Sequence, residues 1–85
     1  MSGSGDTDPI KTVVEVVARA LVDHPDAVRV TENERRGLKV YSLSTALGDM
    51  GKIIGRQGRT AAALRTLVAA TAEKHGRRAQ LDIRD

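Results

Sequence analysis

The fold of this chain is decided by one stretch, Gly51-Lys52-Ile53-Ile54-Gly55-Arg56-Gln57-Gly58-Arg59. A four-residue Gly-x-x-Gly turn, residues 55–58, joins two segments whose apolar residues recur at helical spacing. Two glycines three residues apart let the backbone turn tightly and let a ligand approach without an intervening Cβ atom. The helix after the turn directs its free amide N–H groups and the positive end of its dipole at that point. The turn is therefore predicted to hold a phosphate.

The composition limits the class of protein. Eighty-five residues suit one small domain, which we expect at residues 8–85 after a flexible tail at residues 1–7. The chain is 40% hydrophobic and 29% charged, which is typical of a soluble globular protein. It has no cysteine, which excludes disulfides and thiolate metal sites. No apolar run is long enough to cross a membrane or resembles a signal peptide, so we expect a cytoplasmic protein.

The charge is unevenly distributed along the chain. The formal net charge is +3, yet residues 1–48 hold six basic and seven acidic side chains, whereas residues 49–85 hold eight basic and four acidic ones. The basic excess therefore surrounds the glycine turn and favours a polyanionic partner over a merely solvated helix face. With one Tyr, no Phe and no Trp, the chain cannot build an aromatic platform for stacking bases.

Hydrophobic periodicity predicts the order helix, strand, strand, helix, helix, strand. A three-stranded sheet covered on one face by three helices follows from that order, in the α+β class. Asp8 is expected to cap the first helix and Asp49 the short second helix. The first helix is expected to end near His24-Pro25. Strands are expected at residues 28–31, 38–43 and 79–84, with a long charged turn at residues 32–37. The third helix is expected to end about His75-Gly76 and to bury one face, formed by Ala61, Leu64, Leu67, Val68 and Thr71.

These residues resemble the KH domain in its type II arrangement, which has an extra helix and strand at the N-terminus. The resemblance spans residues 8–83 and is strongest over Asp-Met-Gly-Lys-Ile-Ile-Gly-Arg-Gln-Gly-Arg at residues 49–59, a sequence similar to that of small single-domain bacterial KH proteins of the KhpA type. Arg65 in an Ala-rich helix and Asp82-Ile83 near the end continue the likeness. Ala61 departs from the generic KH pattern, which has Ile there, and residues 46–48 replace the usual proline and acidic residue.

The resemblance implies single-stranded RNA binding, with about four nucleotides held at the turn, as in an RNA chaperone or post-transcriptional regulator. By this likeness the turn itself, Gly55, Arg56, Gln57 and Gly58, clamps the sugar-phosphate backbone. The flanking basic residues Lys52 and Arg59 add phosphate contacts. Ile53 or Ile54 lies under the bases unless both belong to the core, and Arg77 and Arg78 close the groove.

Alternative functions would each require particular residues in the sequence. A nucleotide-binding P-loop needs Gly-Lys-Ser/Thr, whereas Gly58 is followed by Arg59-Thr60. No catalytic constellation is apparent, and His24 and His75 lie at expected helix ends, so we expect neither an enzyme nor a metal or cofactor site. A protein-interaction module that uses the same turn and the adjoining helix stays open, because the resemblance implies that small KH proteins of this type form homodimers and pair with a larger KH-containing RNA-binding protein. A ribosome-associated KH domain is a third alternative.

Overall fold

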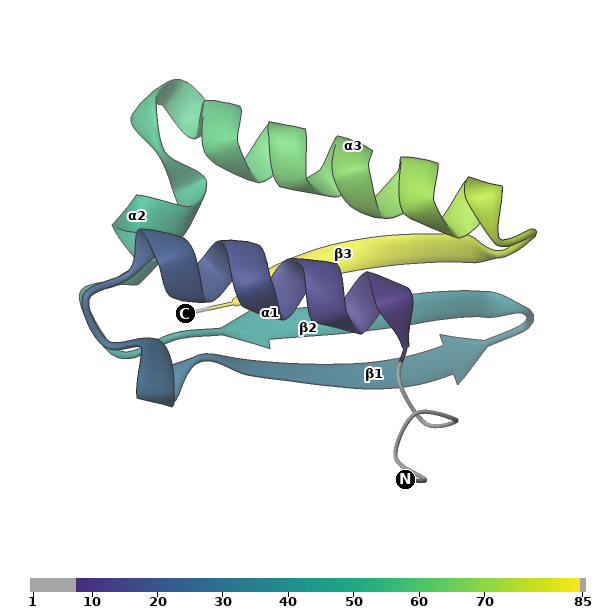
Figure 1. Ribbon diagram of the computed structural model, residues 1–85, viewed down its shortest axis with the longest axis horizontal. Coiled ribbons are helices and arrows are strands. Elements are labelled where there is room, and N and C mark those ends of the chain that lie inside the picture. The colour runs from purple at the N-terminus through teal and green to yellow at the C-terminus, as the bar shows by residue number, and fades with distance from the viewer. Residues whose placement is uncertain (1–7, 85) are drawn as a thin grey trace.

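A computed structural model describes residues 8–84, and the tail expected at residues 1–7 lies outside the described residues. The predicted order of helices and strands is confirmed (Figure 1). Two single 3-10 turns, η2 and η3, are added to it. The elements are α1 (Pro9–Leu21), η2 (Pro25–Ala27), β1 (Arg29–Arg35), β2 (Leu38–Ser44), α2 (Met50–Ile54), η3 (Arg56–Gly58), α3 (Arg59–Lys74) and β3 (Arg78–Arg84).

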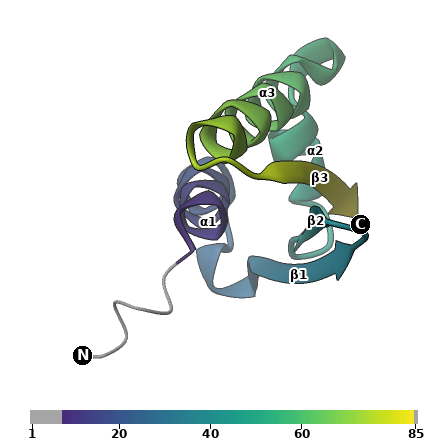
Figure 2. The ribbon, with the colours of Figure 1, turned by 90° about the vertical axis from the view of Figure 1, so that its right-hand side faces the viewer.

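The three strands form one mixed sheet in the order β1-β2-β3. β1 pairs with β2 in antiparallel fashion, and β3 pairs with β2 in parallel. The helices lie on one side of this sheet, with α1 and α3 along it and α2 at its end, while the other side faces away from them (Figures 1 and 2). The predicted α+β fold, a three-stranded sheet with its helices on one face, is therefore confirmed.

The core lies between the sheet and the two long helices. The central strand β2 contributes Tyr41 and Leu43, both fully buried, and the covering helices bury one stripe each. Leu67, expected in the stripe of α3, is 41% exposed, because it lies about 100° around the helix from its neighbour Val68 at the centre of the buried stripe. The buried residues of the three helices are Ile10, Val14 and Ala18 in α1, Met50 and Ile53 in α2, and Ala61, Leu64, Val68 and Ala72 in α3.

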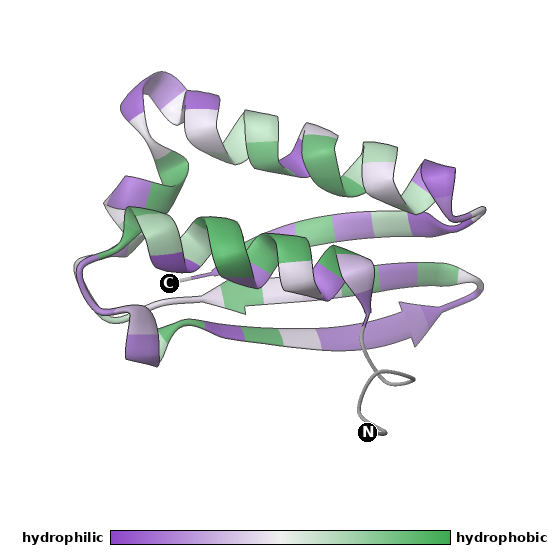
Figure 3. Ribbon diagram, in the orientation of Figure 1, coloured by the Kyte–Doolittle hydropathy of each residue, from purple (hydrophilic) through white to green (hydrophobic). Residues whose placement is uncertain are grey.

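The hairpin between β1 and β2 differs from the expected one. The register pairs Arg35 with Leu38, so the predicted charged turn at residues 32–37 is mostly strand, and only Arg36 and Gly37 form the turn. Both have positive φ, 52° and 81°, as a two-residue type I′ turn requires. β1 is an edge strand that is largely exposed beyond Val30, so its outer half is hydrophilic (Figure 3) and carries no apolar alternation to reveal the strand.

Asp8 caps α1 as predicted and also ties the helix to the sheet. Its carboxylate accepts a 3.0 Å hydrogen bond from the Ile10 N–H and a 2.5 Å hydrogen bond from the Tyr41 hydroxyl. Lys39 Nζ lies 3.5 Å from the same carboxylate. Burial raises the pKa of Asp8, but these hydrogen bonds and the Lys39 charge outweigh it, so the net pKa is below the ordinary value. Asp8 is therefore ionised in the folded protein at neutral pH.

The end of α3 fixes the path into β3. The predicted glycine, Gly76, has a φ of 68°, in the left-handed region. Its N–H donates to the Glu73 carbonyl at 3.0 Å, and the Arg77 N–H donates to the Ala72 carbonyl at 2.8 Å, which is the Schellman pattern. By contrast, α1 ends at Leu21, earlier than the His24-Pro25 end that we expected, because Val22 is already extended.

Candidate nucleic-acid interface

The Gly-x-x-Gly turn lies at one end of the molecule, where α2 meets α3 (Figure 1). Gly55 and Gly58 both have a φ of 73°, and Gln57 between them has a φ of 57°. A Cβ atom at Gly55 would clash with the Thr60 side chain, whereas a Cβ atom at Gly58 would meet nothing within 4 Å. The backbone is therefore packed inward at Gly55 and open to solvent at Gly58, as expected for a turn that a ligand approaches closely.

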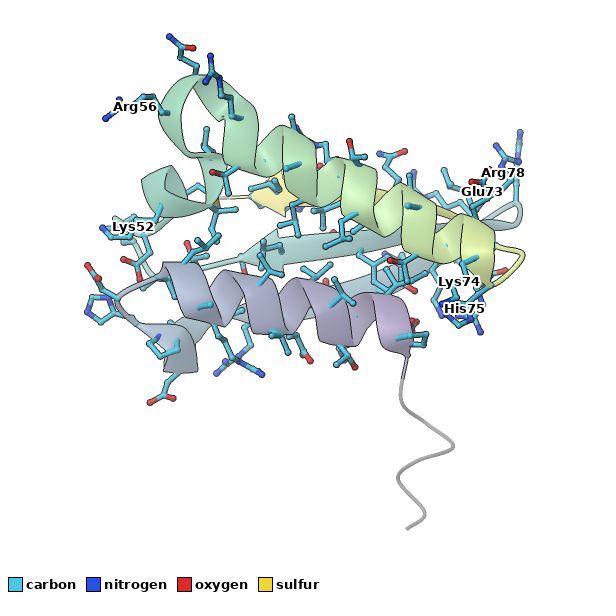
Figure 4. All side chains as sticks on the ribbon, turned by 45° about the horizontal axis from the view of Figure 1, so that its top comes forward. Lys52, Arg56, Glu73, Lys74, His75 and Arg78 are labelled. Carbon is cyan, nitrogen blue, oxygen red and sulfur yellow. The ribbon has the colours of Figure 1, made fainter. Side chains whose placement is uncertain are left out.

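Basic side chains surround this turn. Arg56, Gln57 and Arg59 are exposed, and Lys52 and Arg56 project from the same end of the molecule (Figure 4). Lys52 Nζ lies 3.3 Å from Asp23, an exposed ion pair of the kind that contributes little to stability. The first turn of α3 has no acidic residue, and no side chain caps its N-terminus. The amide groups there thus have no carboxylate of their own helix competing with an incoming anion.

Asp49 positions α2, though not as predicted. It precedes the helix but makes no side-chain cap hydrogen bond to it. Its carboxylate, which is 3% exposed, accepts instead a 3.0 Å hydrogen bond from the His24 N–H and lies 3.1 Å from His24 Nδ1. The capping bond fails because the buried carboxylate satisfies the backbone of the loop after α1. Burial raises the pKa of Asp49, but the His24 hydrogen bonds outweigh it and lower the net pKa.

The two isoleucines before the turn differ in their exposure to solvent. Ile53 is fully buried in the core, whereas Ile54 is 42% exposed beside Gly55. Ile53 therefore supports α2 from below, and Ile54 is the member of the pair that presents an aliphatic surface next to the glycines.

Arg77 and Arg78 are not brought to the turn. They follow the C-terminal end of α3, and Arg78 lies at the opposite end of the molecule from Arg56 (Figure 4). A helix of 16 residues such as α3 is about 24 Å long. The two arginines line an open cavity of about 460 Å³ together with Glu34 and Lys39. Arg77 Nη1 also lies 3.9 Å from Asp8 Oδ1, so its charge is already partly balanced.

The outer face of α3, the helix that adjoins the turn, has six exposed residues that are small or apolar, as the protein-interaction alternative requires. The six residues are Ala62, Ala63, Thr66, Leu67, Ala69 and Ala70. The sequence did not indicate a second open surface, the side of the sheet away from the helices, because its charged residues come from strands that are far apart in the sequence.

Two further features bear on the kind of site. Across residues 8–84, no three His, Cys, Asp or Glu side chains gather in a way that could hold a metal ion. None of the helices in this part of the chain has the length and hydropathy needed to span a membrane.

An α-β-β-α-α-β fold with a Gly-x-x-Gly turn between its second and third helices defines a KH domain of type II. The family model described as KhpA/KhpB, KH domain, matches residues 11–83. The chain therefore belongs to the KhpA/KhpB KH-domain family.

Curated relatives support this assignment. A protein named RNA-binding protein KhpA from Halalkalibacterium halodurans is 55% identical over 76 residues, which cover 89% of this chain and 100% of the relative. Proteins of the same name from Aquifex aeolicus and Treponema pallidum are 46% and 45% identical, covering 87% and 86% of this chain and 94% and 91% of those relatives.

Proposed function

We propose that this protein binds single-stranded RNA and holds about four nucleotides by their sugar-phosphate backbone at the Gly55–Gly58 turn. The observation that carries the proposal is an open glycine turn, flanked by exposed Arg56 and Arg59, at the N-terminus of a helix with no acidic residue in its first turn. The names of the relatives, RNA-binding proteins throughout, support the same partner.

Each residue near the turn has a role in this proposal. The amide groups after Gly58 and the guanidinium groups of Arg56 and Arg59 contact phosphates, while Gln57 at the tip hydrogen-bonds the backbone. Lys52 adds a contact by exchanging its exposed partner Asp23 for a phosphate. Ile54 lies under the bases, with Ile53 as its buried support. Arg77 and Arg78, beyond the far end of α3, lie too far from the turn to take part in the clamp.

Contacts of this kind hold the backbone and do not read the bases. They suit a non-catalytic RNA chaperone or post-transcriptional regulator acting on many cytoplasmic RNAs.

The double variant Arg56→Asp with Gln57→Asp tests the clamp. It puts two carboxylates where a phosphate would lie, and aspartate tolerates the left-handed backbone at residue 57 better than most residues do. We expect it to fold and to lose at least about tenfold in affinity for a labelled RNA of about six nucleotides, measured by fluorescence anisotropy at two salt concentrations.

The matched control is Lys74→Asp with His75→Asp. These adjacent exposed residues lie at the other end of α3 (Figure 4), and the pair makes the same change in formal charge. We expect the control to bind the short RNA within about twofold of wild type. Equal affinities in the two folded variants, checked by circular dichroism, would remove the turn from the mechanism.

A second function is favoured by the outer face of α3. Ala63, Leu67 and Ala70 recur at spacings of four and three residues, which is the a/d spacing of a helix-helix seam, and all three are exposed. We propose that this face carries self-association, or pairing with a larger KH-containing RNA-binding protein. Two domains held together would bind one RNA more tightly through avidity than either domain alone.

Ala70→Glu tests self-association. A carboxylate in the seam would have to be buried unpaired in the interface, so we expect the variant to sediment as a monomer at protein concentrations where wild type is dimeric. Ala20→Glu, at an exposed alanine of α1, is the control and should leave the assembly unchanged. A wild type that stays monomeric at about 100 µM in analytical ultracentrifugation would exclude the homodimer.

A further inference from the structure

The side of the sheet that the helices leave open carries a distinct charge pattern. Along each strand, the residues that alternate with the core residues point to this side. In β1 and β3 the first and last of them are arginines, namely Arg29 and Arg35 in β1 and Arg78 and Arg84 in β3. The register places Arg29 and Arg84 on either side of Ser44, and Arg35 and Arg78 on either side of Leu38. An arginine therefore stands at each of the four corners of the open side, which we call the open sheet face.

The open sheet face has a strong positive balance. Asp82 is the one acidic residue of this face among residues 8–84. The face therefore carries four positive charges and one negative charge. Its surplus of three equals the formal net charge of the whole chain, +3. Arg84 Nε lies 3.2 Å from Asp82, and Arg29 donates to the carbonyls of Asp26 and Val28. Arg35 and Arg78 are exposed and make no ion pair with a described residue. They are the two corner arginines whose side chains have neither an ion pair nor a hydrogen bond to a described residue.

The dimensions of this face match an extended polyanion. With about 3.3 Å per residue along a strand and about 4.8 Å between strands, the corners lie about 20 Å apart along the sheet and about 10 Å across it. A shallow groove of about 200 Å³ lies on this face and is lined by Arg35, Arg84, Asn33, Val40, Ser42, Gln80 and the acidic Asp82. The side chains of Asn33, Ser42 and Gln80 offer hydrogen bonds to phosphates and sugars. The single Tyr of the chain, Tyr41, is fully buried on the opposite side, so this face has no ring on which a base could stack.

One end of the open sheet face lies at the same end of the molecule as the turn (Figure 1). β2 ends at Ser44, between Arg29 and Arg84, and the next helix in the chain is α2, which leads into the turn. We infer that the open sheet face is a second nucleic-acid surface, on which the phosphate backbone of an RNA that extends beyond the clamped nucleotides passes from the Arg29–Arg84 end to the Arg35–Arg78 end. The inference rests on the proposed RNA binding at the turn and extends the protein's footprint to longer RNA.

Two labelled oligouridines separate this surface from the clamp, one of about six nucleotides and one of about 20. The variant Arg35→Gln with Arg78→Gln removes the two corner charges at the end of the sheet remote from the turn. Its affinity for the short RNA should equal that of wild type. Its affinity for the long RNA should fall about fivefold or more, and the slope of log affinity against log salt should shrink by about 1.4, the value for two lost contacts to a single strand.

Lys11→Gln with Arg19→Gln removes the same charge from α1 and is the control, with an expected loss below about twofold on either RNA. Equal losses in the two variants on the long RNA would reduce the effect to net charge and overturn the inference. Unchanged binding of the long RNA by the Arg35, Arg78 variant would also overturn the inference. An acidic protein surface would then be the partner that suits this face. All variants are first checked for folding by circular dichroism.

The turn variant Arg56→Asp with Gln57→Asp, measured on the same two RNAs, tells the two proposals apart. If it binds the long RNA like wild type while the Arg35, Arg78 variant does not, the clamp is wrong and the open sheet face binds RNA by itself. If wild type binds neither RNA, the proposed function and this inference both fail.

Discussion

Gly55 and Gly58 have the same φ but are required for different reasons. Gly55 combines a φ of 73° with a ψ of 179°, a region that is essentially restricted to glycine, and it also packs against Thr60. Gly58 has a ψ of 10°, in the left-handed helical region that other residues reach at moderate cost, and it faces open space. The first glycine therefore shapes the turn, and the second leaves the surface of the turn open.

At this scale we predict unequal costs for two alanine substitutions. Gly55→Ala should lower the free energy of unfolding by about 3 kcal/mol, because the strained backbone and the clash with Thr60 add together. Gly58→Ala should cost about 1 kcal/mol, from the backbone alone. Urea unfolding followed by circular dichroism measures both. Equal costs would show that the contact between Gly55 and Thr60 does not constrain the turn.

At the scale of elements, the tight turn of the β1–β2 hairpin has a poorly suited residue at its first position. Arg36 has a φ of 52°, which a type I′ turn requires but which asparagine or glycine adopts more readily. Gly37, with a φ of 81°, already suits the second position. A residue that adopts positive φ more readily than arginine would therefore make this hairpin more stable.

We therefore predict that Arg36→Asn raises the free energy of unfolding by about 0.5–1 kcal/mol. The β-branched substitution Arg36→Val serves as the opposite control and should lower it by about 1–2 kcal/mol. Arg36 is exposed at the hairpin tip, so neither change disturbs the core. If the valine variant proved as stable as the asparagine variant in urea, the two-residue turn would be wrong.

At the scale of the whole molecule, two carboxylates join parts that are distant in the sequence. Asp8 links the start of α1 to Tyr41 and Lys39 in β2, and Asp49 links the loop after α1, at His24, to the start of α2. Burial together with the Asp8 charge raises the pKa of the Tyr41 hydroxyl, so it remains a donor to Asp8 at any physiological pH. The two carboxylates serve the fold only while they are ionised.

The pH dependence of stability follows from the direction of these shifts. The folded-state pKa values of Asp8 and Asp49 lie below the ordinary value, so their contribution is fully present above the unfolded pKa, about 3.9, and is lost as the pH falls through the folded values. We predict that the free energy of unfolding decreases below about pH 4.

Substitutions locate the origin of that decrease. Asp49→Asn should make the loss of stability below pH 4 less steep, whereas Asp26→Asn, at an exposed residue of η2, should leave it unchanged. Urea titrations at several pH values between about 2.5 and 6 give the slopes. The same slope in all three proteins would mean that Asp49 does not carry the dependence.

The sequence by itself determined the order of the elements and the place of the turn. Helical spacing in α1 and α3, alternation in β3, Asp8 as a cap and Gly76 as a helix end are all local signals, because each depends on backbone geometry within a few residues. The positive φ values at Gly55 and Gly58 are local in the same way, and this is why the candidate site was recognisable in the sequence.

Only the tertiary structure decided which side chains those elements bury and which charges they bring together. Leu67 fits the apolar stripe of α3 by spacing, and the sequence did not distinguish Ile54 from the buried Ile53, yet Leu67 and Ile54 are exposed, because burial depends on where the sheet and the other helices lie. Asp49 binds His24 rather than its own helix, and Arg77 and Arg78 lie a helix length from the turn. The corner arginines come from strands separated by more than 40 residues, and only the pairing of β1 and β3 with β2 places them on one face. Periodicity along a chain reports the direction of a side chain relative to its own element, whereas its neighbours are set by contacts between elements.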